Sequence, residues 1–174
     1  MPPPLDIVFH KGDTRRYRSI LRRADGVAVE LEGGSYNRVG SRELPHDIAH
    51  LIVEDELGLD RGLWGVLAAG GLFPGMPIRA GRQKPHAARH GREVVAAATE
   101  QLNQAEILVR VVCDSAAAGT AHLRRRTGDR WWSETVTHAA VTRALDRLGH
   151  AADDWAQLEP SGVLRFTWRD SIHR

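Results

Sequence analysis

The chain has 174 residues, of which 42% are hydrophobic and 26% are charged. This composition is typical of a globular domain and excludes a disordered chain. The chain has 24 Lys and Arg residues and 22 Asp and Glu residues, and the resulting formal charge of +2 is a weak signal for nucleic-acid binding. A chain of this length buries roughly two-thirds of its unfolded surface, so we expect residues 1–174 to form a single domain.

Several classes of protein are disfavoured by the absence of particular segments. No stretch approaches the roughly 20 apolar residues that cross a bilayer, and the first residues do not have the pattern of a signal peptide. We therefore expect a cytoplasmic protein that does not engage a membrane. The single cysteine, Cys113, follows an apolar run and is predicted to be a buried, inert thiol.

The first predicted elements are two or three antiparallel strands within residues 6–32. Residues 27–32 alternate between apolar and polar side chains, and Asp25-Gly26 is typical of a hairpin turn. A last strand is predicted at 163–168, where it could complete the N-terminal sheet.

A pair of helices is predicted over residues 45–71. Pro45 suits the first position of the first helix and Gly58 its end, and Asp60 can cap the second, shorter helix. The remaining expected elements are a loop at 72–84 that could cover a site, a central core helix at 85–114, and a helix at 133–149 that Gly149 ends. Together these elements predict an α+β fold, with a small antiparallel sheet packed on four to five helices.

The most informative side chains lie on the first of these helices. At about 100° per residue, His46, Asp47, His50 and Glu54 share one arc of the helix, and apolar residues flank it on both sides. Two histidines one turn apart can bind one metal ion, and Glu54 on the next turn can bind it too or orient a histidine.

Ordinary helix electrostatics also explain an acidic first turn, and a lone His-x-x-x-His is common by chance. The metal interpretation is favoured because this polar cluster interrupts a face that would otherwise be buried. Burying such groups without partners would cost several kcal/mol, so an ion or a dense hydrogen-bond network is expected there.

The segment His46-Asp47-Ile48-Ala49-His50 resembles the HD-x-x-H zinc motif of a ubiquinone-biosynthesis family. That family has a Glu after eleven further residues, where this chain has Gly62, so Glu54 would have to supply the third ligand. The segment is more distantly similar to the HE-x-x-H helix of zincin metalloproteases, in which the Glu is the general base. Asp47 is one methylene shorter than that Glu.

The same segment also resembles the helix that carries the His-Asp doublet of HD-domain phosphohydrolases. That family needs a further His and Asp, for which His10 and Asp114 are available. His10 lies in a predicted strand, whereas the family is all helical, so this resemblance ranks below the other two.

Two further histidine signals are weaker. His86 and His90 repeat the same spacing, but charged neighbours indicate a solvent-exposed turn. His138 falls on the apolar face of the last helix, where it is either a core histidine or a further metal ligand.

These patterns lead to the hypothesis of a small metal-dependent enzyme that acts on a small-molecule substrate. The predicted ligands are His46, His50, Glu54 and His138, zinc is the first choice of ion, and Asp47 or Glu54 is the catalytic base.

The alternative is a binding module without catalytic activity. In it the same residues form a buried hydrogen-bond network, and an arginine-rich surface meets an acidic partner. Nucleic-acid binding through residues 124–132, which combine arginines with Trp131 and Trp132, is a third possibility that we rank lower.

Overall fold

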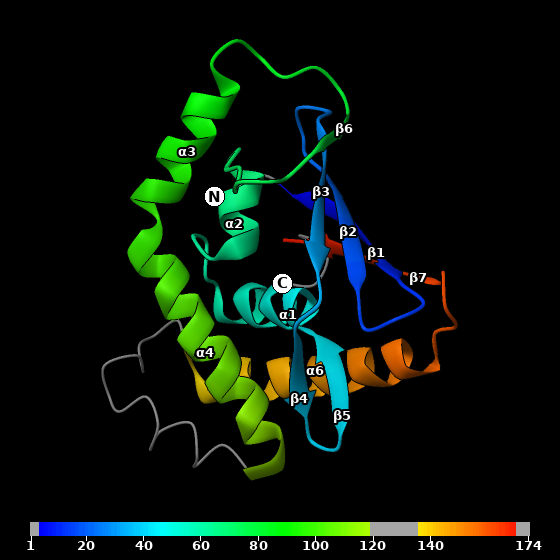
Figure 1. Ribbon diagram of the computed structural model, residues 1–174. Coiled ribbons are helices and arrows are strands. Elements are labelled where there is room, and N and C mark those ends of the chain that lie inside the picture. Colours follow the sequence, from blue (N-terminus) through cyan, green and yellow to red (C-terminus); the bar gives the residue numbers. More distant parts are fainter. Residues whose placement is uncertain (1–3, 119–135, 170–174) are drawn as a thin grey trace.

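The computed structural model describes residues 4–118 and 136–169. In this part of the chain, a five-stranded antiparallel sheet and a separate two-stranded sheet pack with five helices (Figure 1). The predicted α+β fold class is therefore confirmed.

The larger sheet contains both the first and the last strand of the described chain. Its strand order is β6-β3-β2-β1-β7, and every neighbouring pair is antiparallel. The strands are β1 (Leu5–Lys11), β2 (Tyr17–Arg22), β3 (Ala28–Gly33), β6 (Ile78–Ala80) and β7 (Val163–Trp168). β7 pairs with β1 from Leu5↔Trp168 to His10↔Val163, so the C-terminal strand does complete the N-terminal sheet.

Three short strands were not predicted. β6 lies within the expected loop at 72–84 and pairs with β3, where Arg79 makes two hydrogen bonds of 2.8 Å to the Glu30 carboxylate. The hairpin of β4 (Tyr36–Val39) and β5 (Arg42–Pro45) forms the second sheet and leads directly into the first helix. Strands of three or four residues are too short to leave a clear periodic signal.

The first helix, α1 (His46–Leu57), is the buried centre of the fold. It ends where Gly58 adopts the left-handed conformation, with φ of 69°, as predicted. Pro45 was predicted as its first residue but is the N-cap and the last residue of β5, so the helix begins one residue later. The second helix, α2 (Leu63–Ala68), is preceded by Gly62 and has no side-chain cap. The expectation that Asp60 caps α2 is wrong, because the Asp60 carboxylate is paired with Arg169.

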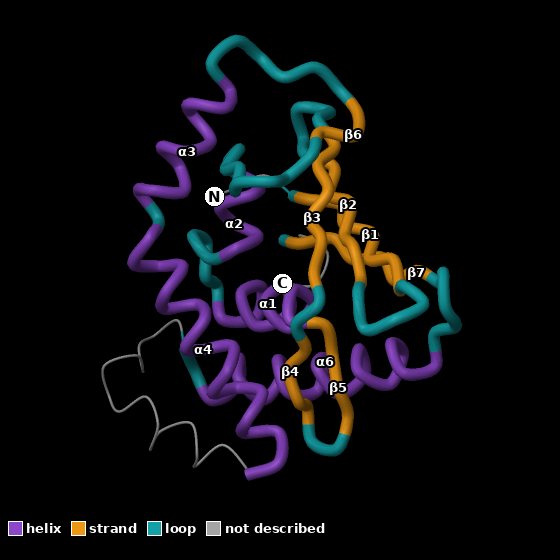
Figure 2. The backbone as a smooth tube through the Cα atoms, viewed as in Figure 1, coloured by secondary structure: helices purple, strands orange, loops and turns teal. Residues whose placement is uncertain are grey.

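The helix predicted at 85–114 is two helices that are interrupted at Ala98. They are α3 (Ala87–Ala97) and α4 (Thr99–Ala118), and the break is visible between them in Figure 2. Within α3 only Gly91 is buried, so the interpretation of this segment as the central core helix is wrong for its first half. Its exposed arginines and glutamate keep α3 at the surface, whereas α4 buries an apolar face and contacts α1.

The last helix, α6 (His138–Gln157), is longer than expected. The Oγ1 of Thr137 caps it by accepting a hydrogen bond from the amide of Ala140. Gly149 does not end it, because the apolar face continues through Ala152 and Trp155 and holds the next turns against the core. The predicted cap at Ser133 and the basic segment 124–132 lie outside the described residues.

Aromatic side chains join these layers in the core. Phe9 of β1 meets Trp64 of α2 edge to face, with ring centroids 5.7 Å apart, and Tyr17 of β2 meets Trp155 of α6 at 6.2 Å. Cys113 is buried as predicted, and burial raises the pKa of its thiol to about 12. None of the helices in residues 4–118 and 136–169 combines the length and apolar character that crossing a bilayer requires.

Candidate metal centre

Two histidines from α1 and one glutamate from α4 form a group that could hold a metal ion. Their ligand atoms, from His46, His50 and Glu106, all lie within 4.8 Å of one another. The histidines are adjacent because they are one helical turn apart, with ring centroids separated by 4.5 Å. Glu106 joins them because α4 crosses the start of α1.

The carboxylate of Glu106 faces both imidazoles with a single oxygen. Its Oε1 lies 3.4 Å from Nε2 of His46 and 3.3 Å from Nε2 of His50. A tetrahedral zinc ion with bonds of 2.0–2.1 Å holds its ligand atoms roughly 3.3 to 3.4 Å apart. These two separations are compatible with atoms that share one ion, and they are also those of ion pairs between imidazolium and carboxylate groups.

The other nitrogen of each imidazole is already engaged. Nδ1 of His46 donates to Oδ1 of Asn37 over 2.7 Å, and Nδ1 of His50 donates to Oε1 of Glu54 over 2.9 Å. In the neutral rings, these bonds place the proton on Nδ1 and leave the lone pair of Nε2 free to bind a cation. Both Nε2 atoms then lie near the carboxylate of Glu106.

His50 is the most enclosed of the three groups. Its side chain is 2% exposed, and its Nε2 lies at ion-pair distance from Glu106 but makes no hydrogen bond of good geometry. His46 and Glu106 are 26% and 57% exposed, so the group opens to solvent on their side. A buried nitrogen without a hydrogen bond is costly, and an ion at this position would satisfy it.

The charges within this group shift the pKa values of His50 and Glu106. Burial acts to lower the pKa of His50, but the carboxylates of Glu106 and Glu54 outweigh burial and raise it to about 9. The contact with His50 in turn lowers the pKa of Glu106 to about 2. A protonated His50 and an ionised Glu106 therefore form the expected state without a bound ion.

Glu54, which was predicted as a third ligand or as the catalytic base, lies behind His50. Its carboxylate is fully buried and accepts hydrogen bonds from His50 and from the amides of Leu63 and Trp64, at 2.9, 2.7 and 3.0 Å. The sequence also suggested that Glu54 could orient a histidine instead of binding the ion. Its hydrogen bond with Nδ1 of His50 favours this orienting role over direct binding. Glu54 is not in the group of ligand atoms around Glu106.

Asp47 is buried beside the same group. Burial raises the pKa of its carboxyl, while His46, His50 and a hydrogen bond with Tyr17 act in the opposite direction. The burial of Asp47 on α1 agrees with the predicted arc of polar residues, which points into the protein. A carboxyl group with a raised pKa is suited to proton transfer, which is the role predicted for it.

The other histidines considered in the sequence and described by the structure, His86, His90 and His138, do not join the group. His138, predicted as a core histidine or a further ligand, is exposed at the first position of α6, because α6 begins with this residue and its apolar face starts at Ala140. His86 and His90 are exposed at the start of α3, as expected.

Glu106 was missed by sequence reasoning. Nothing in its local pattern distinguishes it from a solvent-exposed acid on a helix, although it is the sole acidic residue between Glu100 and Asp114. Its role depends on the packing of α4 against a helix 60 residues earlier in the sequence, as the separation between His46 and Glu106 shows.

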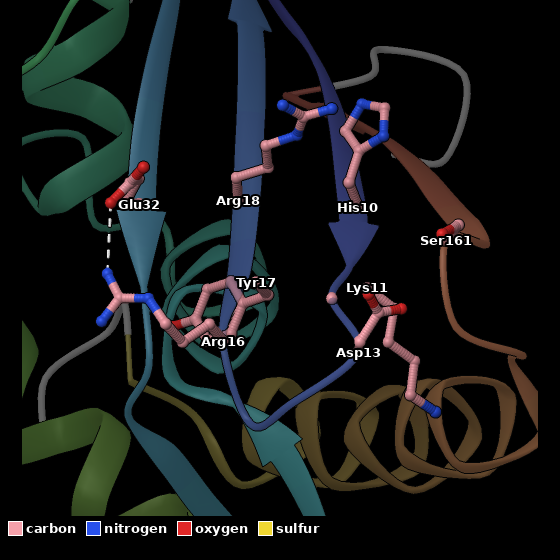
Figure 3. Close-up of a pocket in the computed structure, with 9 residues that line it drawn as sticks. His10, Lys11, Asp13, Arg16, Tyr17, Arg18, Glu32 and Ser161 are labelled. Carbon is pink, nitrogen blue, oxygen red and sulfur yellow. Dashed lines mark hydrogen bonds and ion pairs between the residues drawn. The ribbon is translucent and has the colours of Figure 1, made fainter.

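In a polar pocket elsewhere on the sheet, two of the cations, Arg16 and Lys11, are engaged by acceptors of the protein. Figure 3 shows this pocket, in which Arg16 is paired with Glu32 at 3.1 Å. Nζ of Lys11 donates to the carbonyl oxygens of Trp155 and Leu158 near the end of α6, at 2.8 and 2.6 Å. None of the residues that line it belongs to the group of His46, His50 and Glu106.

Comparison with protein-family models, with curated proteins and with solved structures finds no match to this chain.

Proposed function

We propose that this protein is a small metal-dependent enzyme in which His46, His50 and Glu106 hold one divalent ion. The observation that carries the proposal is the position of two Nε2 atoms at 3.3 and 3.4 Å from one carboxylate oxygen. Because both Nδ1 atoms are held by oxygen acceptors, these imidazoles are oriented as metal ligands usually are.

The donor set favours zinc as the ion. Two imidazoles and one carboxylate are a common set in catalytic zinc sites, which keep a fourth position for water or substrate. The exposed side of the group, at His46 and Glu106, leaves room for such a position. An ion bound there would polarise a carbonyl or activate a water molecule, and a small organic substrate suits this chemistry.

The residues around the ligands have distinct proposed roles. Asp47 is the proposed proton acceptor, since it is buried beside the histidines and its pKa is raised by that burial. Glu54 and Asn37 are positioning residues, because each accepts a hydrogen bond from the Nδ1 of one histidine.

Metal analysis of the purified protein tests the proposal. We expect one zinc ion per chain after zinc supplementation, and less than about a tenth of that amount in His50→Gln, since losing a ligand usually costs more than the 10–100-fold of losing its hydrogen-bond partner. The double variant His86→Gln with His90→Gln is the matched control, because it removes the same histidine spacing from an exposed helix.

Two results would contradict the proposal. One is a wild-type protein without stoichiometric ion after supplementation, and the other is an equal loss of zinc in the control variant.

A second function has a specific observation in its favour. The pKa of His50 is about 9 and that of Glu106 is about 2, so the two groups form a charged pair whose charges are balanced without an ion. This fits a binding module without catalytic activity whose arginine-rich surface meets an acidic partner. In that case His50→Ala would lower folding stability while wild type and variant both remain free of metal, and partner binding would weaken steeply with salt.

A further inference from the structure

A second polar pocket lies away from the proposed metal centre. It has a volume of about 490 Å³ and is formed by the turn between β2 and β3, the end of α2 and the start of α3. The basic residues that line it come from two of these segments and are Arg23, Lys84, His86 and His90. None of these residues belongs to the group around Glu106.

Arg23 is the unusual member of this lining. Its side chain is only 5% exposed, and two of its nitrogens, Nε and Nη2, donate to the carboxylate of Asp25 at 3.3 and 3.1 Å. The third nitrogen, Nη1, is buried and has no hydrogen-bond partner among the described residues. A buried guanidinium donor without an acceptor is costly, so its position implies a missing acceptor.

The free nitrogen of Arg23 faces the histidine side of the pocket across Gly70. A Cβ at Gly70 would lie 3.9 Å from both Nη1 of Arg23 and Nε2 of His90. Gly70 has a φ of 94°, a conformation that disfavours any side chain, so the space between these two nitrogens is kept open by the backbone itself.

The start of α3 borders the same pocket, and the amides of Ala87 and His90 there already donate to the carbonyl oxygens of Lys84 and His86. This helix of 11 residues has no side-chain cap and no acidic residue in its first turn. The N-terminal end of a helix carries a partial positive charge, which favours an anion nearby. Lys84 and His86 precede this turn and line the pocket with it.

We propose that this pocket binds a phosphate group, either as free phosphate or as the monoester of a small molecule. Arg23 and Lys84 supply two positive charges against the single carboxylate of Asp25. Their donors, together with His90 and the positive end of α3, converge from two segments, the turn between β2 and β3 and residues 84–90, as the several oxygens of a phosphate require. The pocket of Figure 3 differs, because Lys11 and Arg16 there are already engaged by acceptors of the protein.

Titration of the full chain with inorganic phosphate and, separately, with glycerol phosphate tests this assignment. We expect saturable binding, followed by calorimetry, and selective changes in the backbone amide signals of residues 87–90 in NMR spectra. Lys84→Gln and Arg23→Gln should each weaken binding about tenfold, the usual effect of losing one charge-assisted bond. Tighter binding of the ester than of free phosphate would identify a small phosphorylated molecule as the ligand.

The matched control is Arg92→Gln, which removes an exposed charge of α3 that does not line the pocket. Equal weakening in this control, or the absence of saturable binding in wild type, would overturn the assignment. Tight binding of an oligonucleotide with no response to phosphate would overturn it too. If Arg23→Gln does not fold, Lys84→Gln and the amide signals still decide. His50→Gln should leave phosphate affinity unchanged, which separates this site from the proposed metal centre.

Discussion

The carboxylates of Glu54 and Glu106 both contact the imidazole of His50, but one is buried and the other is exposed to solvent. Glu54 is fully buried and has three hydrogen-bond donors, whereas the Glu106 side chain is 57% exposed. The cost of removing a carboxylate depends on how many buried donors it leaves without an acceptor. Variants at these two positions should therefore affect folding stability and metal binding separately.

We expect Glu54→Ala to lower the free energy of unfolding by at least about 3 kcal/mol, since it leaves two amides and one imidazole without their acceptor. Glu106→Gln should change stability by less than about 1 kcal/mol, as is usual at exposed positions, and should still remove a ligand of the proposed ion. Urea unfolding and metal analysis of both variants check these outcomes. A large loss of stability in Glu106→Gln would contradict this division.

The pair of His50 and Glu106 also predicts how stability depends on pH. The folded pKa of His50, about 9, lies above the ordinary value of 6.5, so its contribution is complete below pH 6.5 and is lost as the pH rises through 9. The pKa of Glu106, about 2, lies below the ordinary 4.5, so its contribution is complete above pH 4.5 and is lost as the pH falls through 2.

We expect the metal-free protein to lose stability in urea between pH 6.5 and 9, and this loss should disappear in His50→Gln. Because an ion must displace the proton of His50, zinc affinity should rise over the same interval of pH. Zinc affinity that does not change with pH would indicate that His50 is not a ligand.

At the scale of elements, the contact between α1 and α2 requires a residue without a side chain. A Cβ at Gly62 would lie 2.3 Å from Cδ of Glu54, closer than atoms can approach. The φ of Gly62 is −75°, which other residues adopt freely, so space and not backbone conformation requires glycine here. This close approach lets the amides of Leu63 and Trp64 reach the Glu54 carboxylate.

Gly62→Ala should therefore cost about 1–3 kcal/mol of stability, the usual effect of overpacking a buried contact. Gly149→Ala is the control, because Gly149 lies inside α6 with no atom within 4 Å of the added Cβ. That variant should gain about 0.5–1 kcal/mol from helix propensity. In thermal unfolding, a lower melting temperature for Gly62→Ala and a higher one for Gly149→Ala would support this explanation. An unchanged melting temperature for Gly62→Ala would refute it.

For the whole molecule, the C-terminal strand joins elements that are distant in sequence. β7 pairs with β1, and the fully buried Trp168 fills the core beside it. The next residue, Arg169, donates its backbone N–H to Asp55 at 3.3 Å, and Asp55 also pairs with Arg147 of α6 at 2.8 Å. The end of α1 is thus connected to both the sheet and the last helix.

Trp168→Ala should lower stability by about 3–5 kcal/mol, as deletion of a buried aromatic side chain usually does. Thr167→Ala, at an exposed position of the same strand, should cost only about 0.5 kcal/mol. Calorimetric melting of both variants provides the measurement. Similar melting temperatures would show that β7 does not contribute to the core.

Local patterns were sufficient for the elements whose signal lies in neighbouring residues. The alternation in 27–32, the turn at Asp25-Gly26 and the glycine end of α1 depend on backbone preferences within a few positions, and all three are present in the structure. The break at Ala98 and the extension of α6 past Gly149 were not predicted, because packing against the rest of the protein decided them.

The sequence by itself determined that His46, Asp47, His50 and Glu54 share one face of a helix, since helical periodicity is a local property. Only the tertiary structure decided what lies opposite that face. It placed Glu106 of α4 before the two Nε2 atoms, put Glu54 behind His50, and left His138 in solvent. The physical reason is that periodicity fixes the direction in which a side chain points, whereas its partner comes from the packing of segments far apart in the chain.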